Sequence, residues 1–408
     1  TDTALWIVGR KSGGEECDRH LENDFTLSQE EEALLREVCA RFQKVAVVLN
    51  VNGVIDLSWV EKHPQVKALL FLGIPGQEGA AALARLLTGK ANPSGKLAFT
   101  IAKRYEDYPA CRNFSWDKGH PETILTYEDY GLIPPPTKGE FLHRPVTVYR
   151  EGIYPGYRYF DAFGKEPLFP FGFGLSYTQF RWAASNLEKE LKGASVRIAV
   201  KNVGSRPGNE TLQLYISPTG TSSEQPMQTL KAFAKTGLLA PGDEEMLTLT
   251  VPWRELATYE ENRAAWVIEE GTYLLRVGNS SRATQVVGAV QVDKDILVEQ
   301  ISNRLSMDPA YAAQVKFLHR QPPAAPILGK DLPCLVVTAQ DVPCWETPGV
   351  PVLDCSRLSD RQLAALCVGY GPGIPFSAFR DVPDPNTIFE NDGSPVAVND
   401  HPEGVNGY

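Results

Sequence analysis

The stretch Ala4-Leu-Trp-Ile-Val8, followed by Gly9-Arg-Lys-Ser-Gly-Gly-Glu-Glu-Cys-Asp18, decides how this sequence folds. The apolar run predicts a buried strand of the kind found in parallel sheets. A glycine-rich loop at the C-terminal end of such a strand is where open α/β sheets bind ligands. A phosphate-binding loop would continue after Gly14 with Lys and Ser or Thr, but this chain continues with Glu15 and Glu16, which would repel phosphates. The loop therefore suits a neutral or cationic substrate, or proton transfer. On spacing alone, a solvated acidic loop is the alternative.

The residues after this loop continue the alternation of helices and strands. Ser28 and Glu31 form a capping-box pattern, which begins an amphipathic helix over 28–42. The apolar runs predict further strands over 45–51, 66–72 and 97–101, a short helix over 58–63, and a helix over 80–88 that ends at Gly89. Alternating strands and helices predict a parallel sheet with helices on both faces. Residues 1–179 are therefore an α/β-sandwich domain.

The middle of the chain changes character twice. The connection over 103–145 is too long for an ordinary loop, and long loops in compact domains are often functional. Residues 146–177 are rich in aromatic residues and glycine, which suits either stacking on sugar rings or, more commonly, packing on a neighbouring domain. From residue 180 to 293 the hydrophobic period becomes two and turn clusters separate short strands. This pattern predicts an immunoglobulin- or fibronectin-III-like β-sandwich.

Composition excludes several classes of partner. The net charge of −10 disfavours nucleic acid and anionic membrane surfaces, and no apolar run approaches the ~18 residues of a membrane span. Seven cysteines without a Cys-x-x-Cys pair favour free thiols in a reducing compartment such as the cytoplasm. No Cys/His spacing matches a zinc site, so we expect no metal and no cofactor.

These motifs together resemble glycoside hydrolase family three, the β-glucosidase and β-xylosidase family. Gly14-Glu-Glu-Cys-Asp-Arg19 with Asp24-Phe25 resembles the loop that holds the acid/base glutamate of that family. The other matching stretches are Val47-Val-Leu-Asn50, Pro75-Gly-Gln-Glu-Gly79, Asn92-Pro-Ser-Gly-Lys-Leu97, Tyr154-Pro-Gly-Tyr-Arg-Tyr-Phe160, Phe171-Gly-Phe-Gly-Leu-Ser-Tyr-Thr178, Val200-Lys-Asn-Val-Gly204, Leu230-Lys-Ala-Phe233 and Leu239-Ala-Pro-Gly242.

The resemblance implies a divided enzyme. In the family, a barrel supplies the nucleophilic aspartate in a Ser/Thr-Asp-Trp context, and no tryptophan here follows an aspartate. Leu358-Ser-Asp-Arg-Gln-Leu-Ala-Ala-Leu366, which contains a second capping box and predicts a helix, resembles the start of that barrel. We therefore expect a permuted member of the family, with residues 294–408 as linker and start of the barrel module. On this interpretation the chain is a fragment that lacks most of the barrel.

The resemblance also implies site residues. Glu15 is the expected acid/base, with Glu16 the alternative, because a one-residue gap would exchange them. Asp18 and Arg19 are expected beside the substrate, chiefly to fix the loop, and Tyr154 at the pocket rim. The implied partners are a β-linked oligosaccharide or glucoside and the barrel, and an oligomer is compatible with the sequence.

The implied reaction is retaining hydrolysis of terminal non-reducing β-D-glucosyl residues, with the isolated chain inactive. β-Xylosidase or N-acetylglucosaminidase specificity is the closest alternative. The rivals from other classes are a non-catalytic carbohydrate-binding or scaffold protein built from the same two domains, and a nucleotide-binding α/β protein, which Glu15 and Glu16 disfavour.

Overall fold

The computed structural model describes residues 2–10, 21–112, 126–129, 131, 148–302, 313–321, 323–324, 328–329 and 332–342, and the backbone of 388–389 and 395–396. The chain divides into two compact units, Thr1–Trp345 and Glu346–Tyr408. In the second unit, β17 (Ile388–Phe389) pairs antiparallel with β18 (Pro395–Val396). The helix predicted within 358–366 lies outside the described residues.

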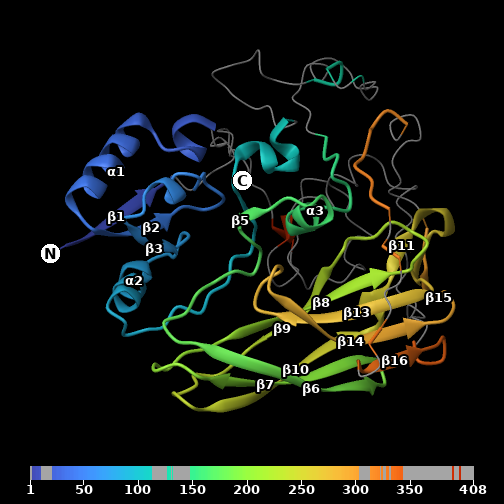
Figure 1. Ribbon diagram of the computed structural model, residues 1–408. Helices are drawn as coiled ribbons and strands as arrows, with labels where there is room; N and C mark the ends of the chain where they lie inside the picture. The colour runs from blue at the N-terminus through green and yellow to red at the C-terminus, as the bar shows by residue number, and fades with distance from the viewer. Residues whose placement is uncertain are drawn as a thin grey trace. The chain divides into compact units, whose positions relative to one another are not determined.

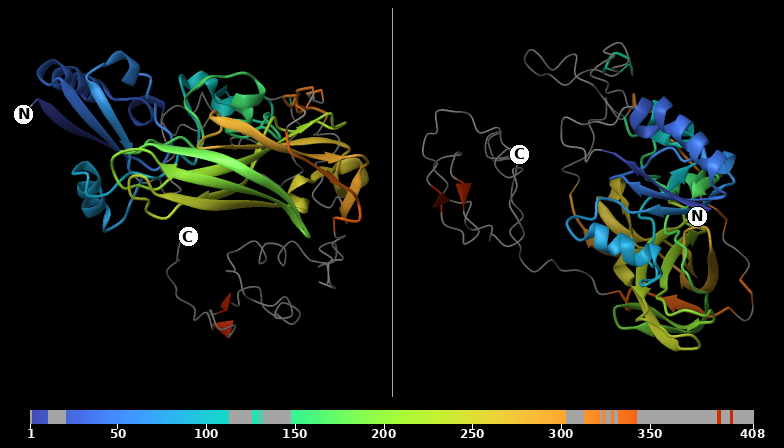
Figure 2. Two further views of the ribbon diagram at one scale, coloured as in Figure 1. Left: turned by 60° about the horizontal axis from the view of Figure 1, so that its bottom comes forward. Right: turned by 90° about the vertical axis from the view of Figure 1, so that its left-hand side faces the viewer.

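A three-stranded parallel sheet forms the N-terminal part of the first unit. Its order is β1 (Thr3–Gly9), β2 (Lys44–Asn50) and β3 (Val66–Phe71). The views in Figures 1 and 2 place α1 (Gln29–Arg41) on one face of this sheet and α2 (Gly79–Leu87) on the other. The predicted α/β architecture is confirmed, and the bounds of these elements lie within one or two residues of the predicted ones.

Helix α1 begins as its sequence predicts. The Ser28 hydroxyl accepts a hydrogen bond from the Glu31 N–H at 3.2 Å, and the Glu31 carboxylate accepts one from the Ser28 N–H at 2.9 Å. This reciprocal capping satisfies two backbone donors that a helix start leaves without partners. Leu35 and Cys39 then lie on the buried face of the helix.

The α1 side of the sheet holds its core. Trp6 and Val8 from β1 and Val47 and Leu49 from β2 are buried there, and Trp6 meets Trp59 edge-to-face at 5.6 Å. The alternation of strand side chains sends the neighbouring residues to the other face. On that face Leu5 and Ile7 are 50% and 52% exposed.

Two predicted elements differ in the structure. The strand expected over 97–101 does not join the parallel sheet. Instead β4 (Ile101–Ala102) pairs antiparallel with β5 (Pro167–Phe169), and the Leu97 N–H donates to the Phe173 carbonyl at 2.9 Å. Its partners are thus residues more than 60 positions away, which a local pattern does not reveal. The short helix expected over 58–63 is one 3₁₀ turn, η2 (Val60–Lys62).

The remaining short helices lie between β1 and α1 and between β4 and β5. They are η1 (Leu21–Phe25), η3 (Tyr105–Asp107), η4 (Pro109–Arg112) and α3 (Tyr157–Ala162). Helix α3 lies above the sheets of the sandwich in Figure 1. No helix in the described ranges is long and apolar enough to cross a membrane.

A β-sandwich follows, as predicted. One sheet has the order β10-β7-β6, a second β16-β14-β13-β8-β9, and a third β11-β12-β15. The strands are β6 (Phe180–Glu190), β7 (Gly193–Asn202), β8 (Thr211–Thr219), β9 (Thr229–Lys235), β10 (Glu244–Pro252), β11 (Thr258–Glu260), β12 (Ala265–Ile268), β13 (Gly271–Gly278), β14 (Thr284–Val292), β15 (Ile296–Gln300) and β16 (Cys334–Val337). Two 3₁₀ turns, η7 (Trp253–Leu256) and η8 (Glu261–Arg263), interrupt them. Because β15 and β16 pair with β12 and β14, the sheets extend beyond residue 293.

The sandwich encloses one apolar core. Strands from the β10-β7-β6 sheet and from the five-stranded sheet contribute fully buried side chains, including Ile198 from β7, Leu214 from β8 and Leu275 from β13. Trp253 on η7 is the largest of them. Alternating residues that meet between two sheets are what a period of two produces.

Candidate active site

The carboxyl edge of the parallel sheet is the candidate site. Gly9 ends β1 there, Asn50 ends β2, and Gly73 follows β3. The Asn50 side-chain amide donates to the Gly73 carbonyl at 2.6 Å, which ties two of these strand ends together. The predicted residues Glu15, Glu16, Asp18 and Arg19 belong to residues 11–20, which lie outside the described residues. The structure does describe both ends of their loop.

Arg10 joins the two ends of that loop. Its Nε donates to the Asp24 carbonyl at 2.7 Å, and its Nη2 donates to the Thr26 carbonyl at 3.2 Å. Its two terminal nitrogens also donate to the Glu31 carboxylate at 2.7 and 2.9 Å. The side chain is only 5% exposed. The first residue after the β1 strand therefore holds the segment that follows the loop and the first turn of α1.

The segment that follows the loop is also fixed from its other side. The Phe25 ring meets the rings of Tyr105 and Tyr108 edge-to-face at 5.3 and 6.3 Å, and the Asp56 N–H donates to the Phe25 carbonyl at 2.9 Å. Burial raises the pKa of Tyr108 to about 12. Asn23, with φ of 67°, turns the chain in η1.

Tyr154, which is predicted at the pocket rim, is the one predicted site residue that the structure describes. It is completely buried, and its hydroxyl donates to Glu224 Oε1 at 2.7 Å. Burial, together with the adjacent carboxylate, raises the pKa of the Tyr154 phenol. These contacts give Tyr154 a packing role between α3 and the sandwich. They lend no support to its predicted contact with substrate.

Glu224 has three partners at this place. Besides Tyr154, it accepts hydrogen bonds from the Arg320 N–H and pairs with His319 Nδ1 at 2.7 Å. Burial acts to raise the pKa of Glu224, but the hydrogen bonds from His319, Tyr154 and the Arg320 N–H outweigh it and lower that pKa. The Leu318 N–H donates to the Arg150 carbonyl at 2.7 Å. The segment between β15 and β16 is therefore held against the loop before α3.

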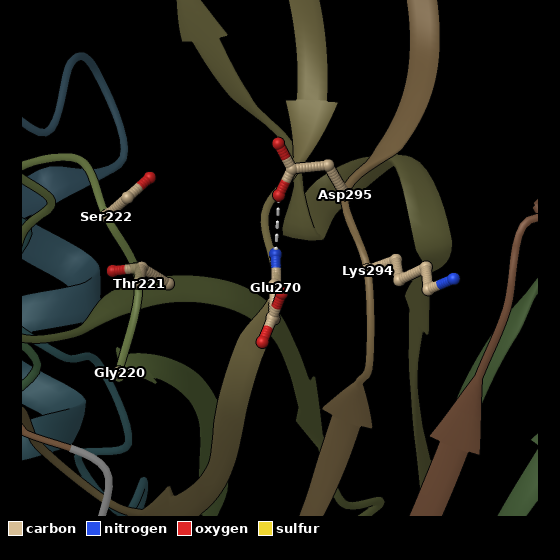
Figure 3. Close-up of a pocket in the computed structure, with 6 residues that line it drawn as sticks. All are labelled: Gly220, Thr221, Ser222, Glu270, Lys294 and Asp295. Atoms are coloured by element: carbon tan, nitrogen blue, oxygen red, sulfur yellow. Dashed lines mark hydrogen bonds between the residues drawn. The ribbon is translucent and has the colours of Figure 1, made fainter.

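One pocket lies elsewhere, in the sandwich. It has a volume of about 410 Å³ and is lined by Gly220, Thr221, Ser222, Glu270, Lys294 and Asp295. Figure 3 shows that the Lys294 side chain points away from Glu270, and Asp295 accepts the Glu270 N–H at 2.9 Å. No aromatic side chain lines it, so it lacks the platform on which a sugar ring stacks. Within the described residues no group of acidic, His and Cys side chains could hold a metal ion.

Comparison with known proteins agrees with this architecture. Residues 1–177 match the glycosyl hydrolase family 3 C-terminal domain, and residues 210–281 match the fibronectin type III-like domain. The chain carries the C-terminal domain of glycosyl hydrolase family 3. The relatives of this family 3 chain include a β-glucosidase of Ruminococcus albus, 33% identical over 75% of this chain and 30% of the relative.

Solved structures give the same result. A β-glucosidase from Paenibacillus barengoltzii superposes with a TM-score of 0.64 at 34% identity, over 74% of this chain and 32% of that one. β-Glucosidase 3B from Thermotoga neapolitana, in complex with glucose, gives 0.61 at 35% identity, over 72% and 38%. The family 3 chain thus spans about a third of the length of the relatives that it matches.

The two most distinctive family 3 motifs join the domains. Asn92 donates to Ser176 Oγ at 2.8 Å and accepts from the Tyr177 N–H at 2.8 Å. Lys96 Nζ pairs with Glu210 Oε1 at 2.8 Å, with the two side chains 12% and 11% exposed. The glycine-rich stretches allow this approach, because a Cβ on Gly208 would overlap the Asn92 amide. These motifs therefore fix the family 3 domain on the fibronectin type III-like domain.

The aromatic residues of α3 serve the same junction. The Tyr157 ring stacks on Phe171 at 4.7 Å, meets Tyr215 of β8 edge-to-face at 6.0 Å, and its hydroxyl accepts the Leu230 N–H of β9 at 2.9 Å. Of the two predicted roles for the aromatic stretch, packing on a neighbouring domain is the one these contacts show.

Sequence reasoning missed Arg10, Glu31 and Glu224 as members of these networks. Arg10 was visible only as one residue of a glycine-rich loop, and Glu31 only as part of a capping box. One signal was available for Arg10: an arginine directly after a buried strand needs a carboxylate partner if it is itself buried. Nothing local pointed to Glu224.

Proposed function

We propose that this chain is part of a retaining β-glycosidase that hydrolyses terminal non-reducing β-D-glucosyl residues. Glu15 of this chain is the proposed acid/base, with Glu16 the alternative, and a barrel outside the described residues supplies the nucleophilic aspartate. Asp18 and Arg19 are proposed to fix the loop beside the substrate. The observation that carries the proposal is the set of contacts from Arg10 to Asp24, Thr26 and Glu31 at the carboxyl edge of a family 3 C-terminal domain whose relatives are named β-glucosidases.

The chemistry explains why a loop of this kind is needed. A retaining glycosidase holds two carboxyl groups about 5 to 5.5 Å apart, one as nucleophile and one as general acid and then base. The acid must keep its proton until the glycosidic oxygen leaves, which requires burial or a neighbouring anion. Adjacent Glu15 and Glu16 provide two carboxyl groups in one loop, so one can act as the anion that keeps the other protonated.

The substrate proposal rests on relatives. The matched proteins of Ruminococcus albus and Butyrivibrio fibrisolvens are named β-glucosidases, and the Thermotoga neapolitana structure contains glucose. Xylose and N-acetylglucosamine are the competing sugars, because the barrel contributes most of the sugar contacts in this proposal. A panel of nitrophenyl β-glycosides assayed with the full-length enzyme decides between them.

The division of the site between two modules can be tested directly. We expect residues 1–408 alone to show no hydrolysis of nitrophenyl β-glucoside, and activity to appear when the barrel is present in the same or a second polypeptide. Circular dichroism should confirm that the isolated chain is folded. Robust hydrolysis by the isolated chain would overturn the proposal.

Azide distinguishes the two glutamates. In the full-length enzyme, Glu15→Ala should slow hydrolysis by about 100-fold or more, since general acid/base catalysis contributes that much. Azide should restore turnover, because it attacks the glycosyl-enzyme directly and needs no general base, and the product should be β-glucosyl azide with release of the enzyme carboxylate. Glu16→Ala is the matched control and should show no rescue. Rescue of Glu16→Ala alone would exchange the two roles.

A further inference from the structure

We propose that Arg10 is a positioning residue for the acid/base loop: its guanidinium fixes both ends of the loop so that the acid carboxyl reaches the glycosidic oxygen. This inference rests on the proposed function. It concerns a residue outside the motif that suggested the acid/base glutamate, and it is argued from contacts that the structure describes.

The contacts of Arg10 span three chain segments. It is the first residue after β1, its guanidinium donates to two carbonyls of the returning segment, at Asp24 and Thr26, and it forms a two-pronged pair with Glu31 of α1. It also donates to its neighbour's carbonyl, Gly9, at 2.8 Å. The strand end, the loop return and the helix start are therefore held by a single side chain.

The chemistry of these contacts requires arginine. The guanidinium presents five donors in a planar fork, whereas a lysine ammonium is a single point with three rotatable donors. Lysine could keep the charge and one contact with Glu31, but it could not also reach the Asp24 and Thr26 carbonyls in the same plane. An Arg10→Lys variant therefore keeps the charge and loses the geometry.

The charge of Arg10 is balanced at the same place. Glu31 lies at 2.7 Å and an Asp24 carboxylate oxygen at 3.6 Å from the guanidinium. An unbalanced cation would favour the ionised form of a nearby carboxyl group, which is the wrong form for a general acid. The contacts of Arg10 with Asp24, Thr26 and Glu31, here called the clamp, can thus hold the loop without favouring loss of the proton from the acid carboxyl.

Glu31 couples this clamp to the helix cap. Its Oε2 accepts from both the Ser28 N–H and Arg10, while its Oε1 accepts from Arg10 only. A glutamine at this position can still accept from the Ser28 N–H, as capping boxes allow, but it offers only one acceptor oxygen. Glu31→Gln should therefore weaken the clamp and keep the cap, whereas Ser28→Ala removes the hydroxyl half of the cap and leaves the clamp intact.

The experiment compares leaving groups in the full-length enzyme. An alkyl β-glucoside needs protonation of its leaving oxygen, while 2,4-dinitrophenyl β-glucoside does not. Because kcat/KM reports steps up to the first bond cleavage, the later action of the base does not affect it. For the alkyl glucoside, we expect Arg10→Lys and Glu31→Gln to lower kcat/KM about 10- to 100-fold, which is the loss expected when the acid carboxyl is misplaced by about 1 Å. For the dinitrophenyl glucoside, we expect the same variants to lower kcat/KM less than about 3-fold.

The controls separate positioning from folding. Ser28→Ala destabilises the same helix start and should leave the ratio of the two kcat/KM values unchanged. Arg36→Lys alters an exposed ion pair on α1, with Glu32 at 3.5 Å, and should change nothing. An equal loss on both substrates in Arg10→Lys and Glu31→Gln would show a merely structural role and overturn the inference.

The two proposals fail differently. If neither Glu15→Ala nor Glu16→Ala shows a leaving-group-dependent loss, the loop does not hold the acid and the proposed function is wrong. If one of them shows it and the Arg10 and Glu31 variants do not, only the inference about Arg10 is wrong.

Discussion

The parallel sheet and the β-sandwich of this chain bury their apolar residues in different ways. In the sandwich, the sheets face each other and enclose side chains such as Leu214 and Leu275 with no exposed surface. In the parallel sheet, the α1 face is covered, but the other face is covered only in part: Val48 of β2 is buried there, while Leu5 and Ile7 of the edge strand β1 remain half exposed. Parallel sheets are generally buried on both faces. The sandwich thus buries its apolar residues between its own sheets, whereas the parallel sheet leaves part of one face exposed and carries loops at its carboxyl edge.

The buried ion pairs of the two regions also have different roles. At the parallel sheet, Arg10 and Glu31 fix a loop. At the border of the sandwich, Lys96 and Glu210 join two domains. A buried charge needs a partner of opposite charge. Each of these ion pairs therefore fixes the position of one chain segment relative to another. Four substitutions test this comparison.

The largest effect is expected in the sandwich core. Leu275→Ala removes a fully buried side chain and should lower the free energy of unfolding by about 2 to 5 kcal/mol. Leu5→Ala, on the half-exposed face, should cost less than about 1 kcal/mol. Urea unfolding of the chain followed by fluorescence measures both. An equal cost at Leu5 would mean that its face is covered in solution and would break the comparison.

The next effect concerns the domain junction. Glu210→Ala leaves the Lys96 ammonium without its carboxylate and should cost about 2 to 3 kcal/mol. Glu255→Ala is the control, because it removes a half-exposed partner of Lys231 at 3.2 Å and should cost less than about 1 kcal/mol.

Calorimetry shows whether this junction couples the two domains. If it does, the Glu210→Ala variant should unfold in two transitions rather than one. A single transition with unchanged midpoint would mean that the ion pair contributes little to holding the domains together.

A smaller, pH-dependent effect is expected at Glu224. Its folded-state pKa is lowered, so it contributes stability that is present above the unfolded-state value of about 4.3 and is lost as pH falls through the folded-state value. Glu224→Gln should therefore cost about 1 to 2 kcal/mol at pH 7, and the difference from the wild type should shrink below pH about 4.

Unfolding at several pH values measures this difference. Glu244→Gln, at an exposed position on β10, is the control for removing a carboxylate from this part of the chain. A Glu224→Gln difference that grows with acid would contradict the assigned direction.

The smallest effect is expected at the start of α1. Ser28→Ala removes a hydroxyl that caps the Glu31 N–H and should cost about 1 kcal/mol. Thermal unfolding measures this, with Ser28→Asp as the control that keeps a capping oxygen. Wild-type stability in Ser28→Ala would mean that Glu31 alone holds the helix start.

The sequence by itself determined the succession of elements. Hydrophobic period, glycine positions and the capping box at Ser28 are local properties, so β1 to β3, α1, α2 and the change to a β-sandwich could all be predicted from them. The position of the loop with Glu15 and Glu16 after β1 was equally local.

Only the tertiary structure decided which distant residues contact one another. Leu97 hydrogen-bonds to Phe173 rather than to the parallel sheet, Tyr154 is buried on Glu224, and Arg10 meets residues 14 to 21 positions away. Each of these contacts depends on which distant segments the folded chain brings together. A periodic pattern records whether a side chain is buried, but not which group it meets there, because side chains with the same local pattern can find different partners.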